Sequence, residues 1–144
     1  VEFDAIRDLM DDGYIVVSTG GGGVPVFEKE GLYEGVPAVI DKDRSSAKLA
    51  ADFGADMLVI LTAVEKVCIN FGKPNQQALD TVSVAQMTRY REEGHFPAGS
   101  MLPKIVASLE FLHHGGKRVV ITSPDCLAAA LRGETGTHIV NEGR

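Results

Sequence analysis

Apolar residues recur along this chain with two patterns, one typical of amphipathic helices and the other of buried strands. Near the beginning, Phe3, Ile6, Leu9 and Met10 recur at helical spacing, and Gly13 ends the predicted helix. Strands that are buried on both faces are expected where apolar residues follow one another almost without interruption. Such runs lie at residues 14–18, 36–40, 57–61 and 118–122.

Helical segments alternate with these runs, and several begin at polar residues that are typical helix caps. Alanines at helical spacing follow Asp41. Further helices are predicted from Ser83 to Gly94, from Ser100 to Leu112 and from Cys126 to Arg132. This alternation predicts an α/β fold with a mainly parallel sheet and helices on both faces, hence three αβα layers. We expect the run at 57–61 to lie in the middle of that sheet.

Residues with weak helical and strand preferences separate these elements. The segment Gly31–Gly35 is predicted to be a turn between two short extended pieces, and residues 72–77 form a polar loop. Residues 64–71 are expected to be extended or irregular. Thr135–Thr137 is predicted to be a turn before the short apolar pair Ile139–Val140.

Composition and charge restrict the possible classes of protein. The 144 residues suit one domain, and 44% hydrophobic with 24% charged residues is ordinary for a globular chain. The net charge of −6 argues against general nucleic-acid binding, which requires clustered cations. Cys68 and Cys126 form no metal-binding motif and support no disulfide, so a reducing, cytoplasmic setting is expected. No apolar run reaches membrane-spanning length, and no membrane association is expected.

Four consecutive glycines, Gly20–Gly23, are the first candidate for chemistry. Consecutive glycines expose backbone N–H groups without interference from Cβ atoms, which allows a phosphate to approach closely. A flexible turn is the alternative, and the surrounding residues match neither a P-loop nor a dinucleotide-binding motif. The tetrad, Lys42, Asp43 and Thr62 all follow predicted strand ends. Because ligands bind beyond the carboxyl ends of parallel strands, we expect these residues to share one edge of the sheet.

Lys104 is a second candidate, since a cation in the first turn of a helix opposes the helix dipole. A bound anion would reverse this unfavourable interaction, whereas a solvated lysine that points away is the alternative. For Asp41 and Asp43 the alternative to a functional role is capping of the helix that follows.

Four segments together resemble carbamate kinases of the amino-acid kinase family. They are residues 18–26 (STGGGGVPV), 38–43 (AVIDKD), 65–76 (EKVCINFGKPNQ) and 99–104 (GSMLPK). The resemblance covers only the carboxyl-terminal half of such enzymes and implies an acetylglutamate-kinase-like fold. Residues 1–144 would then be the nucleotide-binding carboxyl-terminal domain, without the amino-terminal half.

The resemblance also implies a reaction. Carbamate kinases transfer a phosphoryl group reversibly between ATP and carbamate, usually from carbamoyl phosphate and ADP towards ATP during arginine catabolism. Magnesium would accompany the ATP or ADP, and the full-length protein would be a cytoplasmic homodimer. Because the other half carries a further phosphate loop and lysine, this chain alone is expected to bind nucleotide with little activity.

Individual residues receive roles from the same resemblance. Lys42 and Lys104 would neutralise charge on the transferring phosphoryl group, and Asp43 would hold these lysines in place. Gly21, Gly22 and Gly23 would lie near the carbamoyl phosphate. No metal ligand is assigned. Residues that would surround the nucleotide, together with Lys104, are Thr62, Val64, Val67, Ile69, Phe71, Pro74 and Met101. For the aliphatic members of this set, ordinary core packing is the alternative.

Two other functions stay open at this point. The chain could derive from another amino-acid kinase with a different phosphoryl acceptor, although residues 70–76 argue against that interpretation. It could instead be a noncatalytic nucleotide-sensing or assembly module. The four histidines share no spacing and have no neighbouring nucleophile, so surface or packing roles are expected for them.

Overall fold

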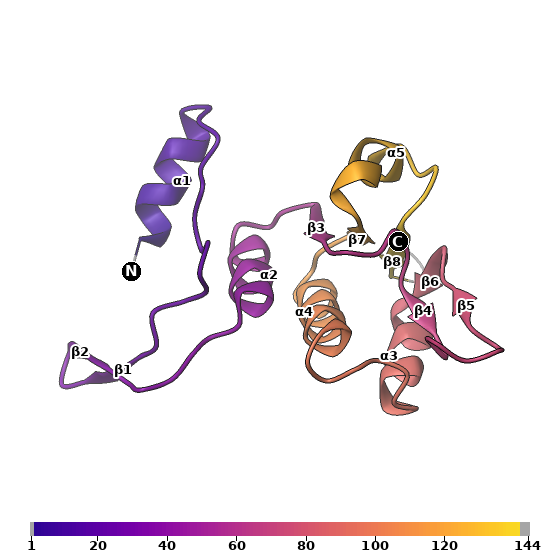
Figure 1. Cartoon of the computed structure of the whole chain (residues 1–144). Helices are drawn as coiled ribbons and strands as arrows, with labels where there is room; N and C mark the ends of the chain where they lie inside the picture. Colours follow the sequence, from indigo (N-terminus) through magenta and orange to yellow (C-terminus); the bar gives the residue numbers. More distant parts are fainter. Residues whose placement is uncertain (1, 142–144) are drawn as a thin grey trace.

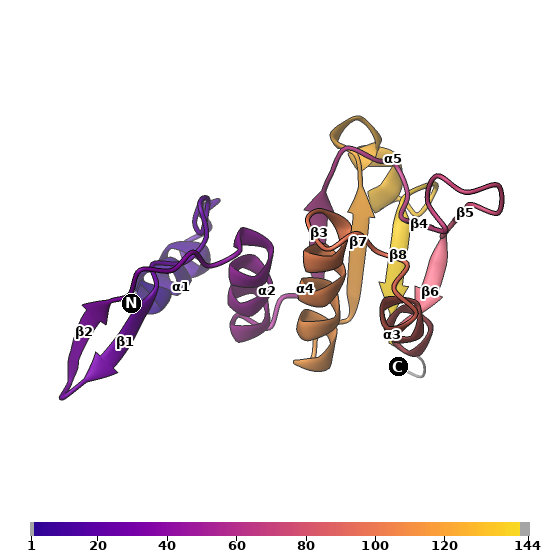
Figure 2. The same ribbon diagram turned by 60° about the horizontal axis from the view of Figure 1, so that its bottom comes forward.

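A four-stranded sheet is the largest sheet of the computed structural model, which describes residues 2–141 (Figures 1 and 2). Its strands are β3 (Met57–Leu61), β7 (Arg118–Thr122), β8 (Thr137–Val140) and β6 (Thr81–Ser83), in this spatial order. The pairs β3–β7 and β6–β8 are parallel, and β7–β8 is antiparallel. The prediction of a mainly parallel sheet is therefore confirmed.

Helices cover both faces of this sheet. One face is covered by α4 (Met101–His113) and α3 (Val84–Glu92), with α2 (Lys42–Asp52) packed beside α4 and against β3. The other face carries α5 (Leu127–Leu131), which follows the short 3-10 turn η1 (Pro124–Cys126) (Figure 1). This arrangement confirms the three-layer αβα architecture.

The core lies between α4 and the sheet, where the strands are apolar on both faces. Ile105, Leu109 and Phe111 of α4 are buried against Val119 and Ile121 of β7. Alternate residues of β7 point to opposite faces of the sheet, and helices cover both. The continuous apolar run in this strand therefore has a partner on each side.

Helix starts follow the predicted caps in two of three cases. The side chain of Asp41 accepts hydrogen bonds from the backbone N–H groups of Asp43 and Arg44, and Ser83 forms a capping box with Gln86. Helix α4 begins directly after Ser100, but the Ser100 side chain makes no capping hydrogen bond. The first turn of α4 therefore keeps backbone N–H groups that no local side chain satisfies.

Three strand predictions were wrong. The run at 57–61 forms β3, but this strand is at the edge of the sheet and pairs only with β7 in the described part of the chain. Residues 14–18 and 36–40 form no strand, and Ile15 is 97% exposed. A strand needs a neighbouring strand to form hydrogen bonds with its backbone N–H and C=O groups. The described chain provides no neighbour for residues 14–18 and 36–40, and none for the outer edge of β3.

Before α2, the chain forms a separate group of elements. Helix α1 (Phe3–Asp11) and the hairpin of β1 (Val26–Lys29) and β2 (Leu32–Gly35) lie on the side of α2 that faces away from the sheet (Figures 1 and 2). Glu30 and Gly31 form the tight turn, and both have positive φ, as favoured turns of two-residue hairpins require. The predicted turn was therefore placed too late, since residues 32–35 are strand.

Short strands after residue 67 were also missed. β4 (Cys68–Ile69) pairs with β5 (Gln77–Ala78) around the predicted polar loop, and β6 ends at Ser83, the cap of α3. Thr137, expected in a turn, begins β8. Two-residue and three-residue strands produce too little periodicity to be recognised from sequence.

Candidate functional site

The glycine loop lies against the segment that leads into α2. Gly22 has a φ of +112°, and a Cβ at this position would be 2.2 Å from the backbone oxygen of Ile40. Its N–H donates to the Thr19 carbonyl at 3.0 Å, and the hydroxyls of Thr19 and Ser46 share a hydrogen bond of 3.3 Å. Only glycine fits at Gly22, so the close contact between the glycine loop and the start of α2 depends on this residue.

Two lysines converge on one carboxylate at the junction of α2 and α4. The Lys104 Nζ donates to Asp43 Oδ2 at 2.9 Å, and the Lys42 Nζ is 3.5 Å from the same oxygen. The side chains of Lys104 and Asp43 are only 13% and 12% exposed. A solvated Lys104 is therefore excluded. Asp41 caps α2, which leaves Asp43 free for this ion pair.

This lysine cluster, Lys42, Asp43 and Lys104, carries an excess of positive charge. Two ammonium groups face one carboxylate at the N-terminal turn of α4, where the backbone N–H groups and the helix dipole also favour an anion. The structure thus brings the three predicted catalytic residues together beside the glycine loop. Their catalytic roles stay a prediction.

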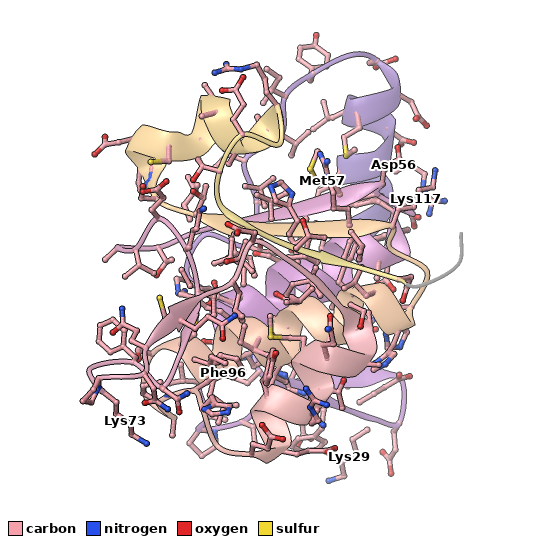
Figure 3. The ribbon with its side chains drawn as sticks, turned by 90° about the vertical axis from the view of Figure 1, so that its right-hand side faces the viewer. Lys29, Asp56, Met57, Lys73, Phe96 and Lys117 are labelled. Carbon is pink, nitrogen blue, oxygen red and sulfur yellow. The ribbon has the colours of Figure 1, made fainter. Side chains whose placement is uncertain are left out.

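A cavity of about 370 Å³ opens at the N-terminal end of α4. It lies beyond the carboxyl end of β3, where the Thr62 N–H donates to the Thr122 carbonyl at 2.9 Å. Figure 3 shows Phe96 of the cavity wall far from Asp56 and Lys117, which precede β3 and β7. The lining residues are Thr62, Ala63, Val64, Lys66, Cys68, Phe71, Gln76, Phe96, Pro97, Ser100 and Met101.

Size and lining make this cavity suitable for a small organic ligand. Ligand sites are typically about 300–1,000 Å³, mostly apolar, with a few polar groups that fix orientation. Met101 begins α4 and lines the cavity, and Lys104 lies one turn further along the same helix. A ligand whose apolar part fills the cavity could therefore extend an anionic part towards the lysine cluster.

Not all residues predicted to surround a nucleotide line this cavity. Thr62, Val64, Phe71 and Met101 do. Val67 and Ile69 are instead part of the hydrophobic core, and the Val67 N–H donates to the buried Thr137 hydroxyl at 2.9 Å.

The alternative of ordinary packing therefore describes Val67 and Ile69 correctly. Pro74 is exposed in the loop between β4 and β5 and is not part of the cavity wall.

Other residues of the wall were missed from sequence. Lys66 pairs with Asp80 at 2.5 Å, and this hydrogen bond raises the pKa of the Lys66 ammonium above its ordinary value. Gln76 accepts a hydrogen bond from the Gly72 N–H at 2.8 Å and so fixes the loop at the cavity entrance. Lys66 could have been suspected as a cavity residue, because it is a charged residue within the mostly apolar segment 64–71. Phe96, in a short loop after α3, gave none.

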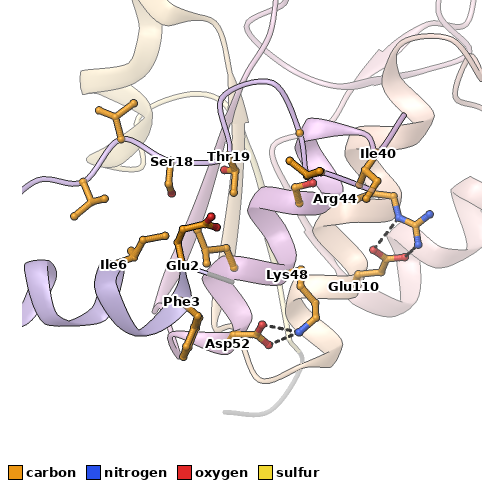
Figure 4. A pocket seen from close by; sticks show the side chains of 17 residues that line it. Glu2, Phe3, Ile6, Ser18, Thr19, Ile40, Arg44, Lys48, Asp52 and Glu110 are labelled. Atoms are coloured by element: carbon orange, nitrogen blue, oxygen red, sulfur yellow. Dashed lines mark hydrogen bonds and ion pairs between the residues drawn. The ribbon is translucent and has the colours of Figure 1, made fainter. Parts of the chain in front are cut away.

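A larger hollow of about 800 Å³ lies between α1, residues 16–24 and α2 (Figure 4). Two ion pairs stand at its wall, Arg44–Glu110 at 2.8 Å and Lys48–Asp52 at 2.5 Å. At its end, the rings of Phe3 and Phe53 stack with centroids 4.5 Å apart. This hollow was not predicted from the residue pattern.

Residues 2–141 contain neither a membrane-spanning helix nor a cluster of metal ligands. No helix there has the length and apolar character needed to cross a bilayer. No three His, Cys, Asp or Glu side chains within this range are grouped so that they could hold a metal ion.

Comparisons with known proteins give a consistent result. Residues 1–123 match the Amino acid kinase family. The chain is 64% identical over 141 residues to the carbamate kinase-like protein YahI of Escherichia coli (strain K12) and 52% identical to the carbamate kinase of Clostridium perfringens (strain 13 / Type A). Each match covers 97% of this chain and 45% of the relative.

A solved structure of carbamate kinase from Giardia lamblia bound to AMP-PNP superposes with a TM-score of 0.95 at 39% identity. This match covers 99% of the present chain and 45% of the Giardia chain. The chain thus spans about half the length of the relatives that it matches. The resemblance to carbamate kinases that the four sequence segments indicated is confirmed.

Proposed function

The chain belongs to the amino acid kinase family, and from this premise we propose that it provides the nucleotide-binding, carboxyl-terminal part of an enzyme that transfers a phosphoryl group reversibly between ATP and carbamate. The names of its relatives support this substrate pair. Because the chain spans less than half of each relative, the activity belongs to the larger protein. The chain alone is expected to bind nucleotide with little turnover.

The observation that carries this proposal is the lysine cluster of Lys42, Asp43 and Lys104. Phosphoryl transfer requires mainly positioning of the reactants and stabilisation of charge on the transferring group. The largely enclosed Lys104 provides such a charge at a fixed place, since Asp43 holds its ammonium at 2.9 Å. Lys42 is more exposed and can turn towards a phosphate. In this proposal both lysines contact the transferring phosphoryl group, and Asp43 positions them.

The 370 Å³ cavity is the proposed site of the nucleotide base. Phe71 and Met101 offer apolar surface for a flat ring, and Thr62 and Gln76 offer polar groups. The Giardia relative was solved with AMP-PNP, an adenine nucleotide analogue. With the base in this cavity, the phosphates would run along the N-terminus of α4 to Lys104.

The glycine loop is the proposed site of the carbamoyl phosphate. Gly21, Gly22 and Gly23 carry no side chains that would block a phosphate, and Gly22 lies next to the start of α2 with its lysine. Backbone N–H groups in such loops bind phosphate oxygens. The two substrates would then meet at the lysine cluster, one from each side.

Magnesium is part of the proposal as a companion of the nucleotide. Mg²⁺ in nucleotide sites keeps several waters and is held by phosphate oxygens with one or two carboxylates. Asp43 is the carboxylate nearest to the proposed phosphates, and its Oδ2 already accepts from lysine. Because this carboxylate is already engaged, phosphate oxygens and water would hold most of the ion's coordination sites, and the ion would reduce the negative charge of the phosphates.

The cellular setting follows from the same relatives as a proposal. The reaction would run from carbamoyl phosphate and ADP towards ATP during arginine catabolism, in the cytoplasm. The full-length protein would be a homodimer. Neither nucleic acid nor a membrane is a proposed partner.

Isothermal titration of Mg-ADP into the chain tests the nucleotide site. We expect saturable binding that Lys104→Ala weakens by about tenfold, the equivalent of one lost charge-assisted hydrogen bond of roughly 1.4 kcal/mol. Lys117→Ala is the matched control, because Lys117 is exposed and lies far from the cavity (Figure 3). Equal effects of both substitutions would contradict the proposed position of the phosphates.

A further inference from the structure

The loop between β4 and β5 forms part of the wall of the 370 Å³ cavity but has little support from the core. It comprises residues 70–76 and stands out from the sheet (Figure 2). Phe71 of this loop lines the cavity, although it is 62% exposed. The two flanking strands pair at only two positions, and pairing of this length stabilises a hairpin only marginally. The shape of the cavity wall at Phe71 therefore depends on contacts within the loop.

The backbone on both sides of Phe71 has a conformation that needs support. The φ angle is +52° at Asn70 and +75° at Gly72. Residues with a side chain adopt this left-handed region at a cost, whereas glycine adopts it readily. Because Phe71 lies between these two positions, its ring stays in the cavity wall only while both are kept.

Gln76 supports this conformation with a single side chain. Its Oε1 accepts a hydrogen bond from the Gly72 N–H at 2.8 Å, and its Nε2 donates to the Cys68 Sγ at 3.7 Å. Only the oxygen of an amide side chain can accept from an N–H group, so the orientation of the Gln76 amide is fixed. A second side-chain contact in the loop, from Asn70 Nδ2 to the Asn75 carbonyl, is longer at 3.4 Å. Gln76 therefore connects the backbone beside Phe71 with β4.

We propose that Gln76 is a positioning residue of the nucleotide site, which holds the loop so that Phe71 stays in the cavity wall and thereby sets the affinity for the nucleoside part of the ligand. This inference rests on the proposed function, because it takes the cavity as the site of the base. Both ends of the Gln76 amide are engaged within the protein, so the residue acts through the loop. Lys104 acts on the phosphates in the same proposal, and the two residues therefore affect different parts of the nucleotide.

Gln76→Met tests the contact with the loop, because methionine has a similar length but cannot accept the hydrogen bond. We expect the Gly72 amide to exchange about tenfold faster in this variant, as the loss of a typical hydrogen bond implies. Gln76→Glu keeps an acceptor oxygen and should retain the slow exchange. Gln77→Met is the matched control, since Gln77 is also exposed and is not part of the cavity wall.

NMR titrations with adenosine and with Mg-ADP test the consequence for the ligand. The apparent affinity falls with the fraction of molecules in the binding-competent conformation, so Gln76→Met should weaken both ligands by the same factor of about five. Gln76→Glu should restore the binding of adenosine, which carries no charge. Lys104→Ala should weaken Mg-ADP and leave adenosine unchanged.

A double substitution shows whether Gln76 acts through Phe71. In a chain that already carries Phe71→Ala, the ring that Gln76 positions is absent. Adding Gln76→Met should then weaken Mg-ADP binding no further, because the two side chains act as one unit.

Three results would overturn the proposal. They are an unchanged exchange rate of the Gly72 amide in Gln76→Met, an effect of this substitution on Mg-ADP but not on adenosine, and additive losses in the double variant. Absence of Mg-ADP binding by the wild-type chain would instead contradict the proposed function. The exchange of the Gly72 amide would still decide whether Gln76 holds the loop.

Discussion

Hydrophobic side chains are mostly exposed in the segment before residue 41 and mostly buried in the segment after it. Every buried hydrophobic residue of the described chain lies at Ala47 or later. Large hydrophobic residues that stay exposed lie almost entirely before residue 41, with Leu61, Phe71 and Leu131 as the exceptions. Both segments have apolar runs of similar length, so the difference is in what surrounds them.

The two segments are therefore stabilised differently, the second by a hydrophobic core and the first mainly by local hydrogen bonds. After residue 41, strands and helices bury one another, and the lysine cluster and the 370 Å³ cavity are built on these packed elements. Before residue 41, α1 and the hairpin form local hydrogen bonds but no core of their own. The glycine loop, which belongs to the first segment, is held in place by its contact with the start of α2.

The largest expected difference is in the cost of removing an aromatic ring. Phe111 is 1% exposed, and its ring fills the space beside Gly116. Phe111→Ala should lower the free energy of unfolding by about 3–5 kcal/mol through the cavity that it leaves. Phe27→Ala, in the exposed strand β1, should change it by less than about 0.5 kcal/mol. Urea denaturation measures both, and similar losses would show that the first segment has a core after all.

Ion pairs should show the same contrast at a smaller scale. Lys104→Ala leaves the enclosed Asp43 carboxylate with only the more distant Lys42, which should cost about 1–3 kcal/mol of unfolding free energy. Lys29→Ala removes an exposed pair with Glu34 and should cost less than about 0.5 kcal/mol. Thermal unfolding at two salt concentrations distinguishes them. A strong salt dependence of the Lys104 effect would mean that the cluster is open to solvent.

The contact between the two segments can be tested at Gly22. Alanine there would require a positive φ and would bring its Cβ within 2.2 Å of the Ile40 oxygen, so the glycine loop should detach. We expect amide exchange at residue 22 to become about tenfold faster, equivalent to about 1.4 kcal/mol of local stability. Gly20→Ala meets no atom within 4 Å and is the control. An unchanged exchange rate in Gly22→Ala would contradict the close approach.

The smallest effect is expected at the surface pair of Asp56 and Lys117. The Lys117 hydrogen bond, with its positive charge, lowers the pKa of Asp56 below the ordinary value of 3.8. A lowered pKa stabilises the folded protein above pH 3.8, and this contribution is lost as the pH falls through the folded-state pKa.

Asp56→Asn should therefore reduce stability only slightly at pH 7, because both side chains are well exposed, and by less at pH 2. Thermal unfolding at the two pH values measures this difference. A larger effect at pH 2 than at pH 7 would contradict the assigned direction of the pKa shift.

Much of the structure after residue 41 could be predicted, because helix caps and apolar strands are recognised from neighbouring residues in the sequence. Ser83 caps α3 as its position suggested, Asp41 caps α2 as one of two candidate aspartates, and α4 begins after Ser100. The apolar strand β7 was recognised from its run of residues alone. In each case the residue pattern and the final environment agree, since the chain itself supplies the cover.

The candidate site was predictable to a lesser degree. The resemblance named Lys42, Asp43 and Lys104 and assigned Asp43 to the lysines, but the residues themselves left both Asp41 and Asp43 as candidate helix caps. It also placed Val67 and Ile69 beside a nucleotide, although they are in the core. An apolar side chain has the same chemical character in a core and in a ligand cavity, so its type does not distinguish the two.

By itself, the sequence determined the layered α/β fold, the main helix boundaries and the family, because these depend on local pattern and on recognisable segments. Only the tertiary structure decided that 57–61 is an edge strand, that residues 14–18 stay unpaired, and that the side chain of Lys104 is largely enclosed beside Asp43. Pairing and burial are relations between segments that are far apart in the chain. A run of apolar residues predicts that the segment will be buried, but it does not identify the segment that packs against it.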